Sequence, residues 1–587
     1  MPHFKTIAEF EAEHGLTVPE KRLIEACRAG EQCVLADTRP EVATQADIIR
    51  ADLLRLLIIG GGTDGGFADS GVWLHGGWIT GPLDLDFATA HGMTTLDACT
   101  FTDPPQMMQA HLRHLSLDDS HLPGLMAQGM VVEGSVLLRR LIATGMVNLA
   151  GAQITGQLDC SGAKLNGQTG LESWGTALNA QAVKVGADLF LCTVTATGTV
   201  NLAGAQITGQ LDCSGATFNG QTGPQSWGTA LNAQGAKVGA SLFLRTVTAT
   251  GTVNLNGAQT EQLDCMEASF DGKSGWALNA QRLVVKQIFF WRKIQQIRGR
   301  VYLASAQVGD LADDLASWPA DLYLDGFTYD RISAAPTDAK QRLGWLSNGS
   351  TINGTFSPQP YTQLAKVLFA MGHDRDARKV LMEREKRLAV EARRTRRRKS
   401  DGVVLLPFES PWEDAAYVAT WLWDALTRWI VGYGFAPIRS FYWMIALLAL
   451  TTALAQATWS EGSFAPNSDV ILTSPSWTDI AALDCKGPLP AKLPDGFTTC
   501  DKNPAETWSD NPDRGLDWTS FNSGAYAADL VIPVLDLGQT SAWAPSKDRS
   551  RMGWIFWWAS WWLEGLGWFI TALGAAAITG LIQRDRE

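Results

Sequence analysis

Three Asp-Cys pairs in the middle of the chain are the first residues whose types and spacing suggest chemistry. Thiolates and carboxylates in a regular row can hold a metal ion, form disulfides or exchange protons in acid-base catalysis. The pairs are Asp159 and Cys160, Asp212 and Cys213, and Asp264 and Cys265. Which of these reactions is available depends on the distance at which the fold repeats the pairs.

The pairs belong to a repeat that reads almost identically three times between Gly145 and Phe270. The copies are GMVNLAGAQITGQLDCSGA, GTVNLAGAQITGQLDCSGA and GTVNLNGAQTEQLDCMEA, and they begin at Gly145, Gly198 and Gly251. Within a copy, apolar side chains recur in short regular steps, as at Leu149 and Ile154. Such steps are typical of a chain that turns a corner after each one and stacks coil upon coil as a solenoid.

The repeat length predicts two coils of about 22 residues and one insert of about nine residues in each copy. The inserts are rich in Gly, Asn, Gln and Ser, and they surround Trp174 and Trp227. These two loops, two coils apart on one edge, form a candidate interaction ridge. The alternative is that the two neighbouring loops pack against each other.

Stacked coils lie about 4.8 Å apart, so equivalent cysteines two coils apart are separated by roughly 10 Å. This distance excludes a disulfide and a shared metal ion. We therefore expect Cys160, Cys213 and Cys265 to be small core residues. The aspartates beside them are expected to point outward into solvent. No catalytic, cofactor-binding or metal-binding residue is predicted, because the eight His residues are scattered and no nucleophile stands with a base.

The solenoid pattern extends from Val72 to Leu324, which predicts a parallel β-helix of about eleven coils over residues 63–335. Residues 1–62 are expected to form a helical cap over the open end of the solenoid. The strongest helical pattern in this cap runs from Ala46 to Ile59 and ends at a glycine-rich stretch. That stretch follows a helix and contains no Lys, whereas a phosphate loop requires a preceding strand and a Lys.

Residues 336–402 are predicted to form a helical hairpin, Tyr361 to Met371 followed by Arg375 to Arg398, with a basic end. The basic residues are Arg393, Arg394, Arg396, Arg397, Arg398 and Lys399. Cytoplasmic segments next to membrane spans are enriched in Lys and Arg. We therefore expect this cluster to lie against an anionic membrane surface.

The C-terminal third is rich in Trp and contains two apolar stretches that are long enough to span a membrane. Residues 437–460 and 553–587 are the predicted spanning segments, the second with an interfacial start, Trp554 to Trp562, and a short cytoplasmic tail. Residues 403–436 carry several charges and are expected to lie in the interface as an amphipathic helix. Residues 461–552 would then form an extracytoplasmic loop domain.

The N-terminal part is expected in the cytoplasm, because Met1 to Leu16 is polar and acidic and does not resemble a signal peptide. Two spans would then return the C-terminus to the cytoplasm. Cys485 and Cys500, which lie outside the cytoplasm in this topology, are expected to form a disulfide.

Residues of the membrane region are candidates for further roles. The apolar stretch from Ala525 to Leu537 contains Asp529, Pro533 and Asp536, and it predicts either a re-entrant segment or a surface helix. Glu564, near the boundary of the second span, is expected to reach the interface. A small-residue face for close helix packing is formed by Gly567, Gly574, Ala577 and Gly580.

Pairs of small and large apolar residues in the repeat resemble those of the pentapeptide-repeat proteins. The matching pairs are Ala152/Ile154, Ala163/Leu165, Ala205/Ile207 and Ala216/Phe218. The resemblance implies a right-handed parallel β-helix. The extra residue on alternate sides of the coil departs from the family's five-residue side.

The whole layout resembles a bacterial family of two-span, membrane-bound β-helix proteins. The matching segments are IRADLLRLLIIGG at 49–61, GVWLHGGWITGPLDLDFA at 71–88, YTQLAKVLFAMGHDRDARKVLMERE at 361–385, WIVGYGFAPIRSFYW at 429–443 and DLVIPVLDLGQTSAW at 529–543. Members of this family are often catalogued as membrane-associated oxidoreductases. The resemblance implies a place in the bacterial inner membrane and a mainly β solenoid with a two-helix transmembrane domain.

Composition narrows the classes of function. The 587-residue chain has a formal net charge of −12, which argues against nucleic acid as a partner. Its nine Cys form no CxxC pair, and no GxGxxG follows a strand, so no zinc, haem or dinucleotide motif supports an oxidoreductase.

Three hypotheses therefore follow. The first is a cytoplasmic β-helix that is anchored in the bilayer and docks other protein subunits. The second is a homo-oligomeric two-span pore with Asp529 and Asp536 along its path. The third is an oxidoreductase, which rests on the family resemblance alone.

Overall fold

The computed structural model describes residues 4–60, 69–170, 173–223, 226–352, 354–399, 411–482 and 503–580. The backbone alone is described at residues 168–170, 173–174, 222–223, 226–227, 274, 352, 395–399 and 411–417. The chain divides into two compact units, Met1–Val380 and Leu381–Glu587. We describe each unit by itself.

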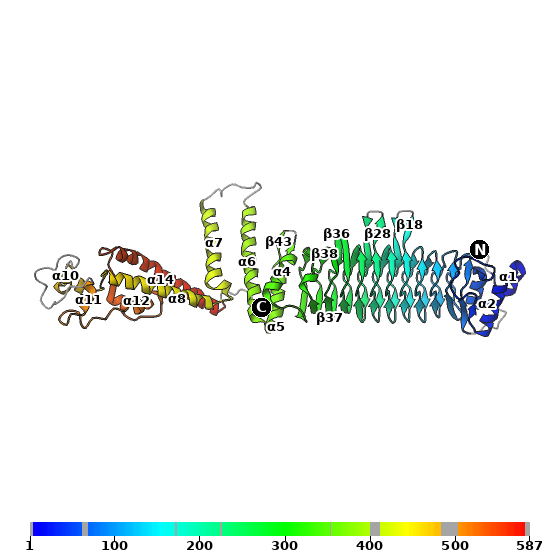
Figure 1. The fold of residues 1–587 in the computed structure, drawn as a ribbon, viewed down its shortest axis with the longest axis horizontal. Coiled ribbons are helices and arrows are strands. Elements are labelled where there is room, and N and C mark those ends of the chain that lie inside the picture. The colour runs from blue at the N-terminus through cyan, green and yellow to red at the C-terminus, as the bar shows by residue number, and fades with distance from the viewer. Residues whose placement is uncertain are drawn as a thin grey trace. The chain divides into compact units, whose positions relative to one another are not determined.

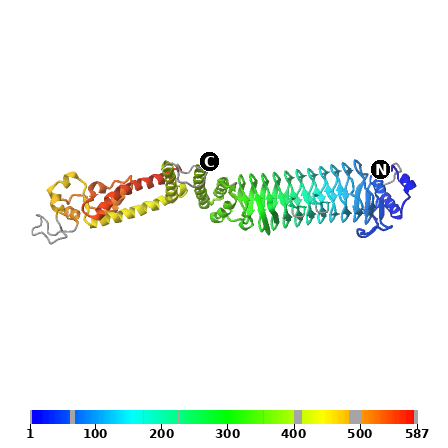
Figure 2. The same cartoon turned by 90° about the horizontal axis from the view of Figure 1, so that it is seen from above.

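The first unit is a parallel β-solenoid of about eleven turns (Figure 1). One turn has four sides, β15 (Gln153–Ile154), β16 (Leu158–Asp159), β17 (Lys164–Asn166) and β20 (Thr176–Asn179). Each side pairs in parallel with the same side of the next turn, so the short strands form ladders along the solenoid (Figure 2). The predicted fold class is confirmed.

The pairing register confirms the two-coil repeat. Val147 pairs with Leu178, 31 residues later, and Leu178 pairs with Val200, 22 residues later. One turn in each copy therefore carries the nine-residue insert that the sequence predicts. The predicted side centres Leu149 and Ile154 are buried, at 0% and 2% exposure.

The corners of the coil require left-handed backbone at fixed positions. Gly151 adopts φ 68° at one corner, and Thr193 adopts φ 54° at another. A residue with a Cβ is strained in this region, whereas glycine is not. Glycine occupies several corners of the repeat, at Gly162, Gly204, Gly215 and Gly257, whereas residues with a Cβ, such as Arg140 and Thr246, adopt the left-handed conformation at others.

The N-terminal cap differs from the prediction in one element. Two helices, α1 (Ile7–His14) and α2 (Val18–Ala29), lead into a short strand, β1 (Cys33–Val34). The helix predicted over Ala46 to Ile59 begins only at α3 (Ala51–Ile58), because Ile48–Arg50 forms strand β2. This strand pairs with β4 (Trp78–Thr80), so β-branched Ile48 and Ile49 complete the first coil of the solenoid.

The C-terminal end of the solenoid is closed by helices. Strands β39 (Gln307–Asp313) and β41 (Thr328–Ile332) belong to the last coils, and helix α4 (Ala339–Gly349), which the sequence did not predict, follows them. Gly349 lies so close to Leu324 that a Cβ would be 2.5 Å from its side chain. The predicted helical hairpin is present as α5 (Gln359–Ala370) and α6 (Asp374–Lys399).

The second unit is built around two antiparallel helices, α8 (Ile438–Ser460) and α14 (Arg551–Ile578). The Ser463 hydroxyl donates to that of Ser550 at 2.6 Å near one end of the pair. Gly574 faces Ser440 near the other end. Both helices are long and apolar enough to cross a membrane, with mean hydropathies of 1.5 and 1.2.

Two further helices accompany this pair, α7 (Pro411–Ile430) and α12 (Ser523–Val531). Helix α12 packs against both α8 and α14, and Tyr526 and Val531 are buried there. The predicted second span is one continuous helix that begins at Arg551, without a break between Trp562 and Leu563. Residues 581–587, the predicted cytoplasmic tail, lie outside the described residues.

Candidate membrane and docking surfaces

The structure places the repeated cysteines in the solenoid core. Cys160, Cys213 and Cys265 are at most 1% exposed, and each has a free thiol. Burial raises the pKa of all three thiols. The prediction of core residues is confirmed for these cysteines, and their thiols are placed to pack rather than to react.

The aspartates beside the cysteines have structural partners. Asp159 Oδ1 accepts hydrogen bonds from the backbone and hydroxyl of Ser161, and Asp212 Oδ1 does the same with Ser214. Each carboxylate therefore holds the turn that follows its strand.

The prediction of a solvated aspartate is wrong for Asp264, which is 0% exposed. Its Oδ2 lies 2.6 Å from Arg245 Nε, and its Oδ1 accepts from Met266 N. The cause is Arg245, one coil earlier, whose guanidinium covers the carboxylate and also lies 4.8 Å from the Phe243 ring centroid. Among the described residues, no three His, Cys, Asp or Glu side chains are placed to hold a metal ion.

The two inserts of the repeat form β-hairpins on one edge of the solenoid (Figure 1). The first pairs β18 (Gln168–Gly170) with β19 (Ser173–Trp174), and the second pairs β28 (Gln221–Gly223) with β29 (Ser226–Trp227). Strand β19 lies next to β28, so the hairpins are neighbours. The side chains of Trp174 and Trp227 lie outside the described residues, and both the ridge and the self-packing hypotheses stay open.

A ladder of asparagines runs along the outer side of one face. Each amide after the first donates to the carboxamide oxygen of the asparagine one coil earlier, at 3.1 to 3.2 Å. The ladder consists of Asn148, Asn179, Asn201, Asn232 and Asn254. It ties successive coils together beyond their backbone bonds.

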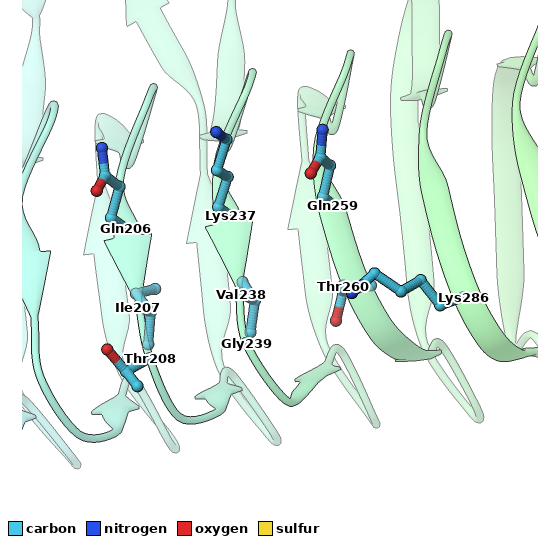
Figure 3. A pocket seen from close by; sticks show the side chains of 9 residues that line it. All are labelled: Gln206, Ile207, Thr208, Lys237, Val238, Gly239, Gln259, Thr260 and Lys286. Atoms are coloured by element: carbon cyan, nitrogen blue, oxygen red, sulfur yellow. The ribbon is translucent and has the colours of Figure 1, made fainter.

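Another face carries a shallow groove of about 240 Å³ (Figure 3). Gln206, Lys237 and Gln259 stand side by side along it on successive coils. At its end, Lys286 Nζ lies 2.6 Å from Glu261 Oε1. The lining of the groove is a regular row of polar side chains that repeats on successive coils.

The basic cluster at the end of α6 is only partly described. Arg393 Nη1 lies 2.8 Å from Asp424 Oδ2 on α7, and Tyr433 donates to the other oxygen of that carboxylate. Arg394 is exposed. The side chains of Arg396, Arg397, Arg398 and Lys399 lie outside the described residues. The Arg393 contact neutralises a charge that α7 would otherwise present to its surroundings.

The second unit exposes a large apolar and aromatic surface. On α14, Trp561 and Trp562 are 67% and 76% exposed. Other exposed large apolar side chains on α7, α8 and α14 include Trp421, Trp423, Trp429, Phe441, Tyr442, Trp443, Leu450, Trp554, Trp558 and Trp568. Soluble proteins rarely expose apolar patches of this extent, whereas membrane proteins present them to lipid.

The stretch predicted as a re-entrant segment or a surface helix forms α12 and the turn after it. The Val531 carbonyl is packed against Gly567, near the middle of α14, where a Cβ would be 2.0 Å from it. Asp529 accepts hydrogen bonds from Leu537 N and Thr540 N, which folds the turn back on the helix.

The other residues of that turn are at its surface. Pro533 is half-buried, and Asp536 is exposed and accepts from Gly538 N. The structure therefore gives Asp529 a role within the chain, and a pore-lining role for either aspartate stays a prediction.

The predicted small-residue face packs within the chain. Gly567 lies against α12, Gly574 lies against Ser440 of α8, and Ala577 is 2% exposed. Gly580 lies beyond the end of α14, adopts φ 77° and has nothing within 4 Å of a built Cβ. Gly580 is therefore not part of the packed face, because the helix ends at Ile578.

The structure also shows a buried ion pair that sequence analysis missed. The Arg342 guanidinium and the Asp313 carboxylate form two hydrogen bonds of 2.8 and 2.7 Å, and both side chains are 0% exposed. No local pattern signals this pair, since 29 residues separate its members. Cys485 and Cys500 lie outside the described residues, so their disulfide stays a prediction.

No protein-family model matches the chain, and no curated protein matches it. The function is therefore inferred from the solenoid and the apolar helices alone.

Proposed function

We propose that this chain is a membrane-anchored β-helix that docks other proteins, as a subunit of a larger membrane assembly in the bacterial inner membrane. The observation that carries the proposal is the exposed aromatic surface of α7, α8 and α14, on a unit whose two main helices have spanning length. A lipid bilayer is the environment that removes such a surface from water.

The solenoid supports the docking part of the proposal. Its outer faces repeat the same polar side chains coil after coil, and repeat proteins commonly use such extended surfaces to bind other proteins. The two neighbouring hairpins add a protrusion on one edge. In this proposal the solenoid lies in the cytoplasm, and residues 461–552 lie on the opposite side of the membrane.

Anchoring is tested by alkaline extraction of membranes from cells that produce either the full chain or a variant ending at Val380. The full chain should stay in the membrane pellet, and the shortened chain should be soluble while keeping the β-rich circular dichroism of the solenoid. A full chain that is released into the supernatant would contradict the anchor.

Docking is tested by replacing residues 167–175 and 220–228 with the shorter connection of the third copy, residues 272–275. The third copy is a matched control, because the same solenoid accommodates it. The variant should still insert, while the native mass of the detergent-extracted complex should fall by the mass of a second polypeptide. An unchanged mass would contradict docking through the hairpins.

A further inference from the structure

Glu564 is the one charged residue in the interior of either candidate spanning helix. The sequence from Ser440 to Trp459 has no Asp, Glu, Lys or Arg, and the sequence from Met552 to Ile578 has Glu564 alone. Ionisable residues at membrane depth are rare and commonly mark a functional contact.

The structure places Glu564 at the centre of its helix. It follows the first residue of α14, Arg551, by thirteen positions and precedes the last, Ile578, by fourteen. At 1.5 Å per residue, about 20 Å separates it from either end. The sequence predicts a place for Glu564 near a boundary of the second span, but it lies at the middle of the continuous helix α14. In a bilayer centred on this helix, a Glu side chain is too short to reach an interface over that distance, unlike a long side chain near a helix end.

The chain leaves this carboxylate uncovered. Glu564 is exposed, and in the part of the chain that the structure describes it makes no hydrogen bond or ion pair. Trp561 and Trp568, one turn before and after it, are exposed too. The packed face of α14 is a different one, which contains Leu563 and Gly567.

The negative charge of Glu564 limits which partner helix can pack over it. An ionised carboxylate at the centre of a bilayer is costly unless a cation or a hydrogen-bond donor meets it. The two spanning helices of a second copy bring no Lys or Arg to that depth, because neither has one in its interior. The complementary partner is therefore a helix that has a positive charge at its centre.

We infer that the face of α14 around Glu564 binds a transmembrane helix of another protein that carries a Lys or Arg near the bilayer centre. The inference rests on the proposed membrane anchoring. It gives the partner protein of the larger assembly a specific binding site, because an ion pair between two helices fixes their relative depth in the bilayer.

The test uses the purified full-length chain in lipid nanodiscs and two synthetic helices as probes. Both probes are Leu/Ala peptides of spanning length that differ at one central residue, Lys or Gln. Energy transfer between labelled chain and labelled peptide reports binding. The wild-type chain should bind the Lys peptide about tenfold more tightly than the Gln peptide.

Two variants make the result specific. Glu564→Gln should abolish the preference for the Lys peptide. Glu461→Gln, at the exposed end of α8, should retain it. Equal binding of both peptides by the wild-type chain would overturn the inference.

Two other outcomes would also overturn it. Self-association of the wild-type chain that Glu564→Gln abolishes would show a second copy sharing a proton with Glu564. Release of the chain from the bilayer by alkaline extraction would overturn the anchoring proposal together with this inference, whereas a retained chain without preference would overturn this inference alone.

Discussion

Buried carboxylates of the first unit are paired with arginines that come from other parts of the chain. Asp264 is covered by Arg245 from the preceding coil, and Asp313 is covered by Arg342 from helix α4. Charged groups without water need a partner, and removing one partner leaves the other uncompensated. These pairs therefore fix which segments lie against each other rather than provide reactive groups.

The pair at the end of the solenoid is expected to be sensitive to the loss of one member. Arg342→Met should lower the free energy of unfolding by about 3–5 kcal/mol, because it leaves Asp313 charged and buried. The double variant Arg342→Met/Asp313→Asn should recover part of the loss. Urea unfolding followed by circular dichroism measures both. An Arg342→Met chain as stable as the wild type would contradict this role.

Glu20 makes stability depend on pH. Burial alone would raise its pKa, but hydrogen bonds from Arg50 and from the backbone of Thr17 outweigh burial and lower the pKa below its usual value. A lowered native pKa stabilises the fold above the unfolded value of about 4.3, and the effect is lost as the pH falls through the native pKa.

Glu20→Gln should therefore be less stable than the wild type at pH 7, and the difference should shrink as the pH falls below about 4.3. Urea midpoints of both chains, measured stepwise from pH 7 downward, test this. A difference that stays constant through the acid range would show that Glu20 acts by packing and not by its charge.

Elements of the chain are held in place by close backbone contact and by ladders between repeats. The asparagine ladder and the parallel pairing link each coil to the next. In the second unit, α12 reaches the middle of α14 because Gly567 leaves room for the Val531 carbonyl. The position of α12 therefore depends on residue 567 being a glycine, which has no side chain.

Two neighbouring glycines of α14 should respond to alanine in opposite directions. Gly567→Ala places a methyl group against the Val531 carbonyl and should destabilise the second unit by about 1–3 kcal/mol. Gly565→Ala meets nothing within 4 Å and should be neutral or stabilising by up to about 1 kcal/mol, because alanine favours a helix. Thermal unfolding in detergent, followed by tryptophan fluorescence, compares them. Equal effects would mean that α12 does not pack on Gly567.

The molecule as a whole combines a solenoid with polar outer faces and a unit with an apolar surface. The solenoid has a single continuous core, in which each coil packs against its neighbours. Local unfolding is therefore expected to spread along the solenoid. The buried cysteines lie at several points along this core, from Cys27 in the cap to Cys265 in the last copy of the repeat.

Thiol labelling should report the unfolding of the entire solenoid. Burial raises the pKa of Cys27 and Cys99 to about 12, so few thiolates are present near neutral pH. In a Cys485→Ser/Cys500→Ser chain at pH 8, only half-buried Cys192 should react before unfolding. The other thiols should become reactive together as urea is raised, measured by mass spectrometry of labelled peptides. Early labelling of one core cysteine would contradict cooperative unfolding.

The coil architecture could be predicted from the sequence because strand partners in a solenoid are separated by a fixed number of residues. The repeats at Gly145, Gly198 and Gly251 therefore specify the register as well as the strands, and the insert lengths follow directly. The two long apolar helices are equally local, since length and composition alone identify them.

Contacts between segments that are distant in sequence were decided only by the tertiary structure. Burial of Asp264 depends on Arg245 from another coil, and strand β2 at Ile48–Arg50 exists because the first coil offers an open edge. The exposure of Glu564 likewise depends on which face of α14 the other helices cover. The spacing of a repeat determines which strands pair, because the partners are separated by a fixed number of residues. Whether a charged side chain is buried or exposed depends instead on every segment that packs around it.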